Sequence, residues 1–106
     1  MATFQNTYVK NVDTAQLTAI TSISDSTIVL SILCANTDGT STVDFTAQRK
    51  DSGSEDKGYL AFTIPVPGDA NFEVLSNKYI LPSGDRILVS ASSSGLLDVQ
   101  VSYVIL

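Results

Sequence analysis

Apolar and polar residues alternate along most of the sequence, and short clusters of turn-forming residues separate the alternating runs. Near the C-terminus, Leu97, Val99 and Val101 fall on one face while Asp98 and Gln100 fall on the other. Successive side chains of a β-strand point to opposite faces, so a period of two predicts strands. The predicted strands are residues 17–23, 28–35, 42–50, 59–64, 72–75, 79–81, 86–91 and 97–106, and residues 4–12 form an edge strand or an extended arm.

Turn signals predict how these strands connect. Pro82 and Gly84 are typical of a β-turn, and residues 92–95 form another turn, so the last three strands are expected to form two successive hairpins. The pair Asp38 and Gly39 predicts a further hairpin between strands 28–35 and 42–50, because both residue types tolerate positive φ.

Two other connections are predicted. Pro65 and Pro67 lack the N–H that a strand ladder requires, so the chain is expected to leave the ladder there and cross from one sheet to the other. Residues 24–26 supply a polar turn after the second predicted strand.

The segment 28–35 is apolar on both faces, with Ser31 as its one polar residue. Such a run predicts an interior strand that is covered on both sides. One face would belong to the core, and the other would be covered by the N-terminal segment, a loop or another subunit.

Length and composition agree with an all-β domain. A chain of 106 residues suits a single domain, residues 1–106, and about eight short strands at regular spacing indicate an antiparallel β-sandwich of jelly-roll type with little or no helix. Cys34 lies in an apolar run and is expected to be a buried, unpaired thiol.

Charge and hydropathy disfavour several partners. The net charge of −5 and the six Lys and Arg residues leave no basic surface for nucleic acid or anionic lipid. No apolar stretch approaches the roughly 20 residues of a membrane-spanning helix, and residues 1–4 do not begin a secretory signal. Synthesis in the cytoplasm, with no nucleic-acid or membrane partner, is expected.

Catalytic chemistry is not predicted either. The chain has no His, and its carboxylates fall mostly in turns, where Asp caps backbone N–H groups. Residues 51–57 form a polar, exposed loop with oxygen ligands of the kind that Ca²⁺ prefers, but their spacing does not match an EF-hand. We expect no enzyme activity, no cofactor and no bound metal.

Several apolar side chains have no obvious place in a single core. The aromatic residues are expected to serve core and interface packing rather than stacking on sugars or bases, and the C-terminal segment is apolar on both faces. The candidate interface residues are Phe4, Tyr8, Val29, Leu33, Tyr103, Val104, Ile105 and Leu106.

Four segments, in their order and spacing, carry a resemblance to a known group. They are residues 31–39 (SILCANTDG), 59–67 (YLAFTIPVP), 79–87 (YILPSGDRI) and 97–103 (LDVQVSY). Over most of its length the chain resembles the small β-sandwich virion proteins of tailed bacteriophages, especially those of marine phages and cyanophages. Proteins of that group often have a Pro-Ala-Gly-like turn after the second strand, which residues 25–27 replace here.

The resemblance implies a non-catalytic structural component of the virion. A capsid decoration or cement protein that binds the major capsid protein is the expected role, because one short domain has no coiled coil or repeat to extend it as a fibre. The alternatives are a neck, baseplate or tail-fibre component, or a module that binds a host receptor or glycan. The second apolar face of residues 28–35, the apolar C-terminal end and the weakly patterned N-terminal segment predict a homo-oligomer, and the resemblance favours a trimer.

Overall fold

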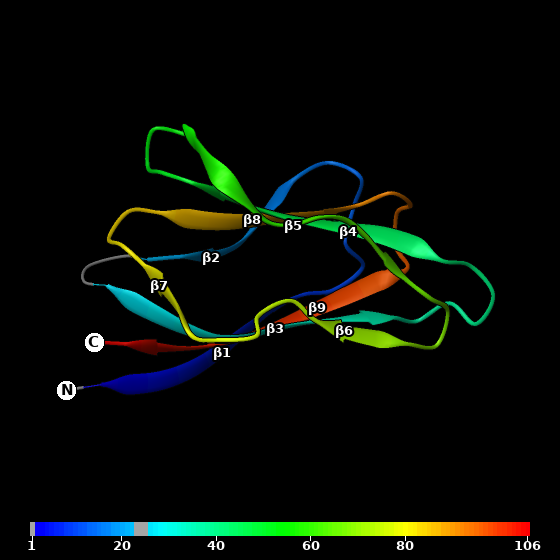
Figure 1. Cartoon of the computed structure of the whole chain (residues 1–106), viewed down its shortest axis with the longest axis horizontal. Helices are drawn as coiled ribbons and strands as arrows, with labels where there is room; N and C mark the ends of the chain where they lie inside the picture. Colours follow the sequence, from blue (N-terminus) through cyan, green and yellow to red (C-terminus); the bar gives the residue numbers. More distant parts are fainter. Residues whose placement is uncertain (1, 23–25) are drawn as a thin grey trace.

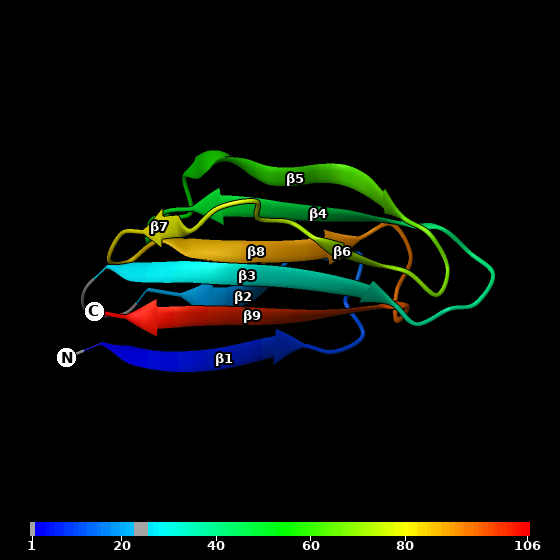
Figure 2. The same ribbon diagram turned by 60° about the horizontal axis from the view of Figure 1, so that its bottom comes forward.

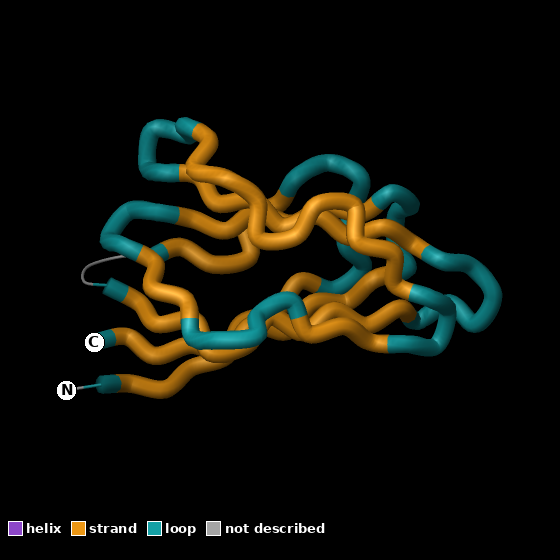
Figure 3. Tube along the Cα trace, in the orientation of Figure 1, coloured by secondary structure: helices purple, strands orange, loops and turns teal. Residues whose placement is uncertain are grey.

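Two β-sheets stack face to face in the computed structural model, which describes residues 2–22 and 26–106 (Figure 1). Strands and loops account for all of these residues, and none of them is helical (Figure 3). The predicted antiparallel β-sandwich is confirmed, and the described residues form nine strands where about eight were expected. The strands are β1 (Thr3–Val9), β2 (Leu17–Thr21), β3 (Thr27–Asn36), β4 (Val43–Lys50), β5 (Asp56–Val66), β6 (Asn71–Glu73), β7 (Tyr79–Leu81), β8 (Arg86–Ala91) and β9 (Leu97–Ile105).

Both terminal strands belong to the same sheet, which we call the terminal sheet. Its order is β1-β9-β3-β6, and β7 also pairs with β3, while the opposite sheet has the order β2-β8-β4-β5 (Figure 2). Every pairing is antiparallel. Among consecutive strands in the described part of the chain, only β4 and β5 pair with each other, so most connections carry the chain from one sheet to the other.

The turn signals predicted two C-terminal hairpins, and this prediction is wrong. β7 pairs with β3, β8 pairs with β2 and β4, and β9 pairs with β1 and β3. Gly84 does have the positive φ of 89° that its turn requires. The turn residues reverse the chain direction, but the reversal spans the roughly 10 Å between two sheets instead of joining neighbours in one sheet.

The hairpin predicted at Asp38 and Gly39 is wrong for a related reason. β3 and β4 lie in different sheets, and neither Asp38 nor Gly39 has the positive φ of a type I′ turn. The Asp38 carboxylate instead accepts the N–H of Ser41 at 3.1 Å, and the backbone carbonyl of Asp38 accepts the N–H of Asp69 at 3.0 Å. This loop is therefore an arch that is tied to the loop after β5.

The proline-rich segment is partly as predicted. Pro65 remains in β5, opposite Asp44, because β5 is an edge strand on which a missing N–H leaves no partner unpaired. After Pro67 the chain does cross, from the opposite sheet to β6 in the terminal sheet.

The strand predicted at 28–35 is β3, at the centre of the terminal sheet. The N-terminal segment does not cover its outer face, because β1 lies in the same sheet as an edge strand beyond β9. After β1 the chain turns into the molecule, where Val12 is fully buried and donates its N–H to the Leu97 carbonyl at 2.8 Å.

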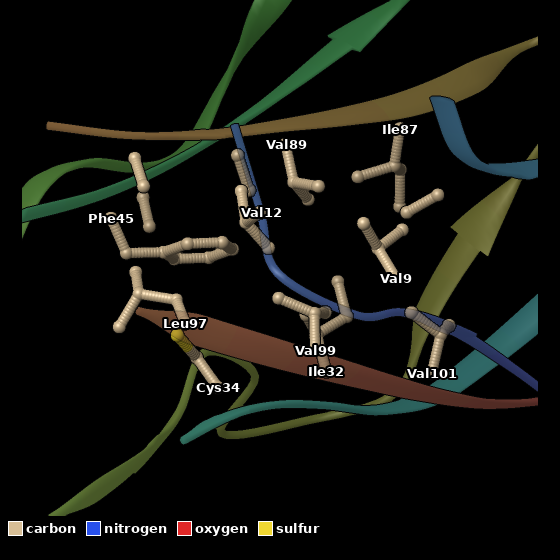
Figure 4. Packing of buried hydrophobic residues seen from close by; sticks show 14 of the residues in the cluster. Val9, Val12, Ile32, Cys34, Phe45, Ile87, Val89, Leu97, Val99 and Val101 are labelled. Atoms are coloured by element: carbon tan, nitrogen blue, oxygen red, sulfur yellow. The ribbon is translucent and has the colours of Figure 1, made fainter. Parts of the chain in front are cut away.

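One hydrophobic core fills the space between the sheets. Ile32, Val99 and Val101 from the terminal sheet pack toward Phe45 and Val89 from the opposite sheet (Figure 4). Cys34 is buried in this core as an unpaired thiol, as predicted.

The predicted turn at 24–26 and the atypical turn at 25–27 fall largely outside the described residues, as does Ile23 of the second predicted strand.

Candidate interaction surface

The two termini lie at the same end of the terminal sheet (Figure 1). At that end, the outer face of the sheet carries a row of apolar side chains. The register places Phe4 opposite Val104, Val104 opposite Ile28 and Ile28 opposite Ile80, across four strands. Directly opposite residues of paired strands share a face, so these four side chains form one line. Phe4 is 76% exposed and Ile80 is 63% exposed, whereas Val104 between them is 6% exposed. We call these four residues the apolar row.

A β-bulge in β3 widens this apolar surface. The register between β3 and β9 shifts between Val29 and Ser31, so Leu30 is an extra residue. Val29 and Ile32 both face the core, which leaves Leu30 and Ser31 between them on the outside. Leu106, two residues beyond Val104 and 50% exposed, extends the same surface at the C-terminus.

Away from the termini the same face becomes polar. Asn6 donates from Nδ2 to Ser102 Oγ at 3.1 Å, and Ser31 donates its hydroxyl to the Glu73 carboxylate. The other oxygen of Glu73 accepts the Ile32 N–H at 2.8 Å, which fixes the end of β6 against β3. Polar side chains therefore border the apolar row on the side away from the termini.

The predicted interface residues divide between the two faces of the terminal sheet. Phe4, Tyr8, Leu33, Val104 and Leu106 lie on the outer face, as the register and the alternation place them. Tyr8 is 67% exposed, whereas Leu33 is only partly exposed.

The remaining three predicted residues lie on the inner face. Val29 is fully buried in the core, so its assignment to an outer surface is wrong. The alternation in residues 28–35 places Val29 and Leu33 on one face, but the bulge at Leu30 reverses the phase between them. Tyr103 packs against the core and donates its hydroxyl to Gln5 Oε1 at 3.0 Å, and Ile105 pairs with the buried Thr27.

Ile28, Leu30 and Ile80 belong to the outer surface but were not among the predicted residues. Ile80 sits in a strand of three residues, which is too short for alternation to assign a face. Its place became evident only from the pairing of β7 with β3.

A second exposed cluster lies on β5, at the edge of the opposite sheet. The rings of Tyr59 and Phe62 meet edge to face with centroids 4.7 Å apart, and the residues are 49% and 60% exposed. Beside Tyr59 lies an open groove of about 310 Å³, lined by residues 57–60 and 74–79. Aromatic walls with amide and hydroxyl groups are of the kind that bind sugars.

The turn between β4 and β5 uses its carboxylates for local structure. Asp51 Oδ1 accepts the N–H groups of Gly53 and Glu55, both at 2.9 Å. The hydrogen bond from Glu55, with that from Gly53 and the charges of Lys57 and Arg86, lowers the pKa of Asp51 below 3.8. Within residues 2–22 and 26–106, no group of three or more His, Cys, Asp or Glu side chains is placed to hold a metal ion.

Arg49, Asp85 and Cys34 carry reactive or charged groups, but these groups take part in the packing of the fold. Arg49 forms an ion pair with Asp85, with 2.5 Å between Nη2 and Oδ2, and donates from Nη1 to the Tyr79 hydroxyl at 3.2 Å. These contacts link β4 to β7 and to the turn before β8. Burial, with a smaller contribution from Asp98, raises the pKa of the Cys34 thiol to about 12, so the reactive thiolate is scarce at neutral pH.

Comparisons with known proteins add evidence on the fold. Neither a protein family nor a curated protein matches the sequence. Among solved structures, the fold is similar to a chain in the crystal structure of the T13 IBDV viral particle, with a TM-score of 0.57 and 4% sequence identity. The match covers 97% of this chain and 30% of that chain, so the protein spans under a third of its structural neighbour. The described residues contain no helix long and apolar enough to cross a membrane. At 4% sequence identity, the similarity to the viral-particle chain shows a shared β-sandwich fold.

Proposed function

We propose that the protein is a non-catalytic structural component of a bacteriophage virion, and specifically a capsid decoration or cement protein. The observation that carries this proposal is the apolar row on the terminal sheet, which would dock on the major capsid protein. Support comes from the resemblance to small phage virion proteins and from a fold similar to part of a viral-particle chain.

The position of the apolar row suits a docking surface. Soluble monomers rarely expose contiguous apolar patches, and such patches commonly mark contacts with other proteins. Phe4 and Ile80 are both more than half exposed, although each could have been replaced by a polar residue without disturbing the core. Polar groups such as Asn6 and Glu73 flank the row, as the polar rim flanks the apolar centre of protein interfaces.

A decoration role is preferred to a neck, baseplate or fibre role because of shape. The described residues form one sandwich with extents of 43 × 27 × 21 Å, a unit that covers a patch of capsid rather than one that reaches outward. The resemblance alone implies a trimer, and the proposed decoration role does not depend on that number of copies.

Quantitative mass spectrometry of purified virions tests the role. A copy number comparable with that of the major capsid protein is expected for decoration. A few copies per particle would instead indicate a neck or baseplate component, and absence from the particle would contradict the proposal.

Binding of variants to virions that lack the protein tests the surface. Ile80→Asp places a charge on the exposed end of the apolar row and is expected to abolish co-sedimentation with the particles. Leu17→Asp is the matched control, because Leu17 is 52% exposed on the opposite sheet. Equal binding by both variants would remove the apolar row from the proposal.

Tyr59 and its groove favour one second candidate, a module that binds a host glycan. A glycan array probed with the wild-type protein and with Tyr59→Ala tests it. Binding that is lost in Tyr59→Ala and kept in Phe4→Ala would support this function, and an array without binding would remove it.

A further inference from the structure

The exposed edges of the two sheets differ in how far they are protected against pairing with another strand. An unpaired edge presents free N–H and C=O groups, and proteins usually blunt it with short strands, bulges, Pro or charges. In the opposite sheet, β2 has five residues and a register shift, and β5 has three register shifts against β4 as well as Pro65. In the terminal sheet, β6 and β7 have three residues each.

The other edge of the terminal sheet, β1, has none of these protections. Its seven residues pair with β9 from Thr3 to Val9 without a register shift. The strand contains no Pro, no Gly and no charged side chain, although the chain carries a net charge of −5. β1 lies at the margin of the molecule with no strand beyond it (Figure 2). It is therefore the one described edge that is regular, neutral and long enough to accept a partner strand.

We propose that β1 pairs antiparallel with β1 of a second copy of this chain, so that two terminal sheets join into one continuous sheet across a two-fold axis. Full overlap of the seven residues sets a single register. Thr3 of one copy faces Val9 of the other, and Asn6 faces Asn6 at the axis. Phe4 then lies directly opposite Tyr8 of the second copy.

This register is self-complementary in its side chains. Phe4 and Tyr8 are both on the outer face and are 76% and 67% exposed, so two aromatic pairs form across the dimer. Aromatic cross-strand pairs stabilise antiparallel strands, and like charges opposite each other destabilise them. Because β1 is uncharged, two acidic molecules can meet there without placing like charges opposite each other on the paired strands.

The proposal goes beyond the proposed function and does not depend on it. A strand pairing of this kind closes with two copies, so it replaces the trimer that the resemblance implies. It also places the apolar rows of the two copies on one continuous outer face, because a two-fold axis perpendicular to the sheet keeps both outer faces on the same side.

Position-specific disulfide formation tests the register. Asn6→Cys places two thiols opposite each other at the axis, within the Cα separation of about 4.4–6.8 Å that a disulfide needs. Phe4→Cys places them four residues apart, about 13 Å along the strand. Thr18→Cys introduces an exposed thiol on β2 and controls for random collision. Cys34 is buried in all variants, and the wild-type chain provides the background rate.

Covalent dimer is expected to form from Asn6→Cys at least about tenfold faster than from either control variant, because only that geometry matches a disulfide. Light scattering of the wild-type protein at micromolar concentrations should give the mass of a dimer. Equal rates at the three positions, a monomer or a trimer would each overturn the proposal.

A second measurement keeps the test independent of the cysteine variants. In the wild-type protein, hydrogen exchange of the β1 amides should slow as the protein concentration rises, because pairing protects the N–H groups that face the free edge. The β2 and β5 amides should show no such dependence. Exchange in β1 that does not change with concentration would contradict the proposal even if the variants misfold.

Discussion

The strongest contrast between single residues is that between two isoleucines on paired strands of one sheet. Ile32 is fully buried between the sheets, whereas Ile80 is 63% exposed on the outer face. Both are apolar in the sequence, so the difference arises from the side of the sheet that each faces. The same substitution at the two positions therefore separates a core role from a surface role.

Ile32→Asp is expected to abolish soluble folding, and Ile80→Asp is expected to fold with a nearly unchanged melting temperature. A buried, unpaired carboxylate costs several kcal/mol against a total stability of about 5–15 kcal/mol, whereas an exposed one remains hydrated. Soluble expression and thermal unfolding by circular dichroism measure both effects. A folded Ile32→Asp protein with the wild-type melting temperature would contradict the position of β3.

Asp51 predicts a dependence of stability on acid. Folding lowers the pKa of this carboxyl below 3.8, because backbone N–H groups donate to its charged form. The folded protein thus binds fewer protons than the unfolded chain in acid. The contribution is complete above the unfolded pKa and is lost as the pH falls through the lower folded pKa.

Asp51→Asn tests this contribution. The amide oxygen still accepts the N–H groups of Gly53 and Glu55, but it does not titrate. Melting temperature measured against pH should therefore fall less steeply in acid for Asp51→Asn than for the wild-type protein. Identical acid slopes for the two proteins would show that the turn carboxylate does not contribute.

At the scale of elements, the C-terminal strand is both a part of the candidate surface and a part of the fold. β9 lies between β1 and β3, and its residues 99–105 pair with both of these strands. Tyr103 pairs with Val29, and Val104 is 6% exposed despite lying on the outer face. The last four residues cannot be removed without disturbing both neighbouring strands.

Deletion of residues 103–106 is expected to lower the melting temperature even in a monomer. Burial of Val104 alone contributes about 2 kcal/mol, and the ladder pairs with β1 and β3 are lost as well. Leu106→Asp is the matched variant, because Leu106 is half exposed and follows the end of β9. Thermal unfolding of both variants measures the difference, and an unchanged midpoint for the deletion would contradict the central position of β9.

At the scale of the whole molecule, one core joins the two sheets, and the reactivity of the Cys34 thiol measures whether that core opens. The thiol is fully buried in β3, and its pKa is raised to about 12. Local opening of an edge strand does not expose it, because β3 is the central strand of its sheet.

Labelling of Cys34 by a thiol reagent is therefore expected to follow global unfolding. Its rate should be negligible in native buffer and should rise with denaturant in parallel with the loss of circular dichroism. Thr18→Cys adds an exposed thiol that should react at once and gives the reference rate. Rapid labelling of the wild-type protein in native buffer would contradict a closed single core.

Local patterns determined which segments are strands and where the chain turns. The period of two identified the strand segments, because alternation follows from the geometry of one strand and needs no neighbour. Pro82 and Gly84 correctly predicted a turn, since the φ preferences of these residue types are a local property. The apolar segments near the two termini also predicted that Phe4, Val104 and Leu106 belong to the interface, and all three lie on the outer face of the terminal sheet.

Only the tertiary structure decided which strands pair and which faces point outward. The sequence around Asp38 is compatible both with a hairpin between neighbouring strands of one sheet and with an arch that carries the chain to the other sheet. Which of the two forms depends on where the apolar faces of both flanking strands can be buried. The bulge at Leu30 turns Val29 into the core and keeps Leu33 outside, and it is fixed by the match of β3 to β9. The apolar row and the free edge of β1 arise from that assembly, because each needs strands that lie far apart in the sequence to come together.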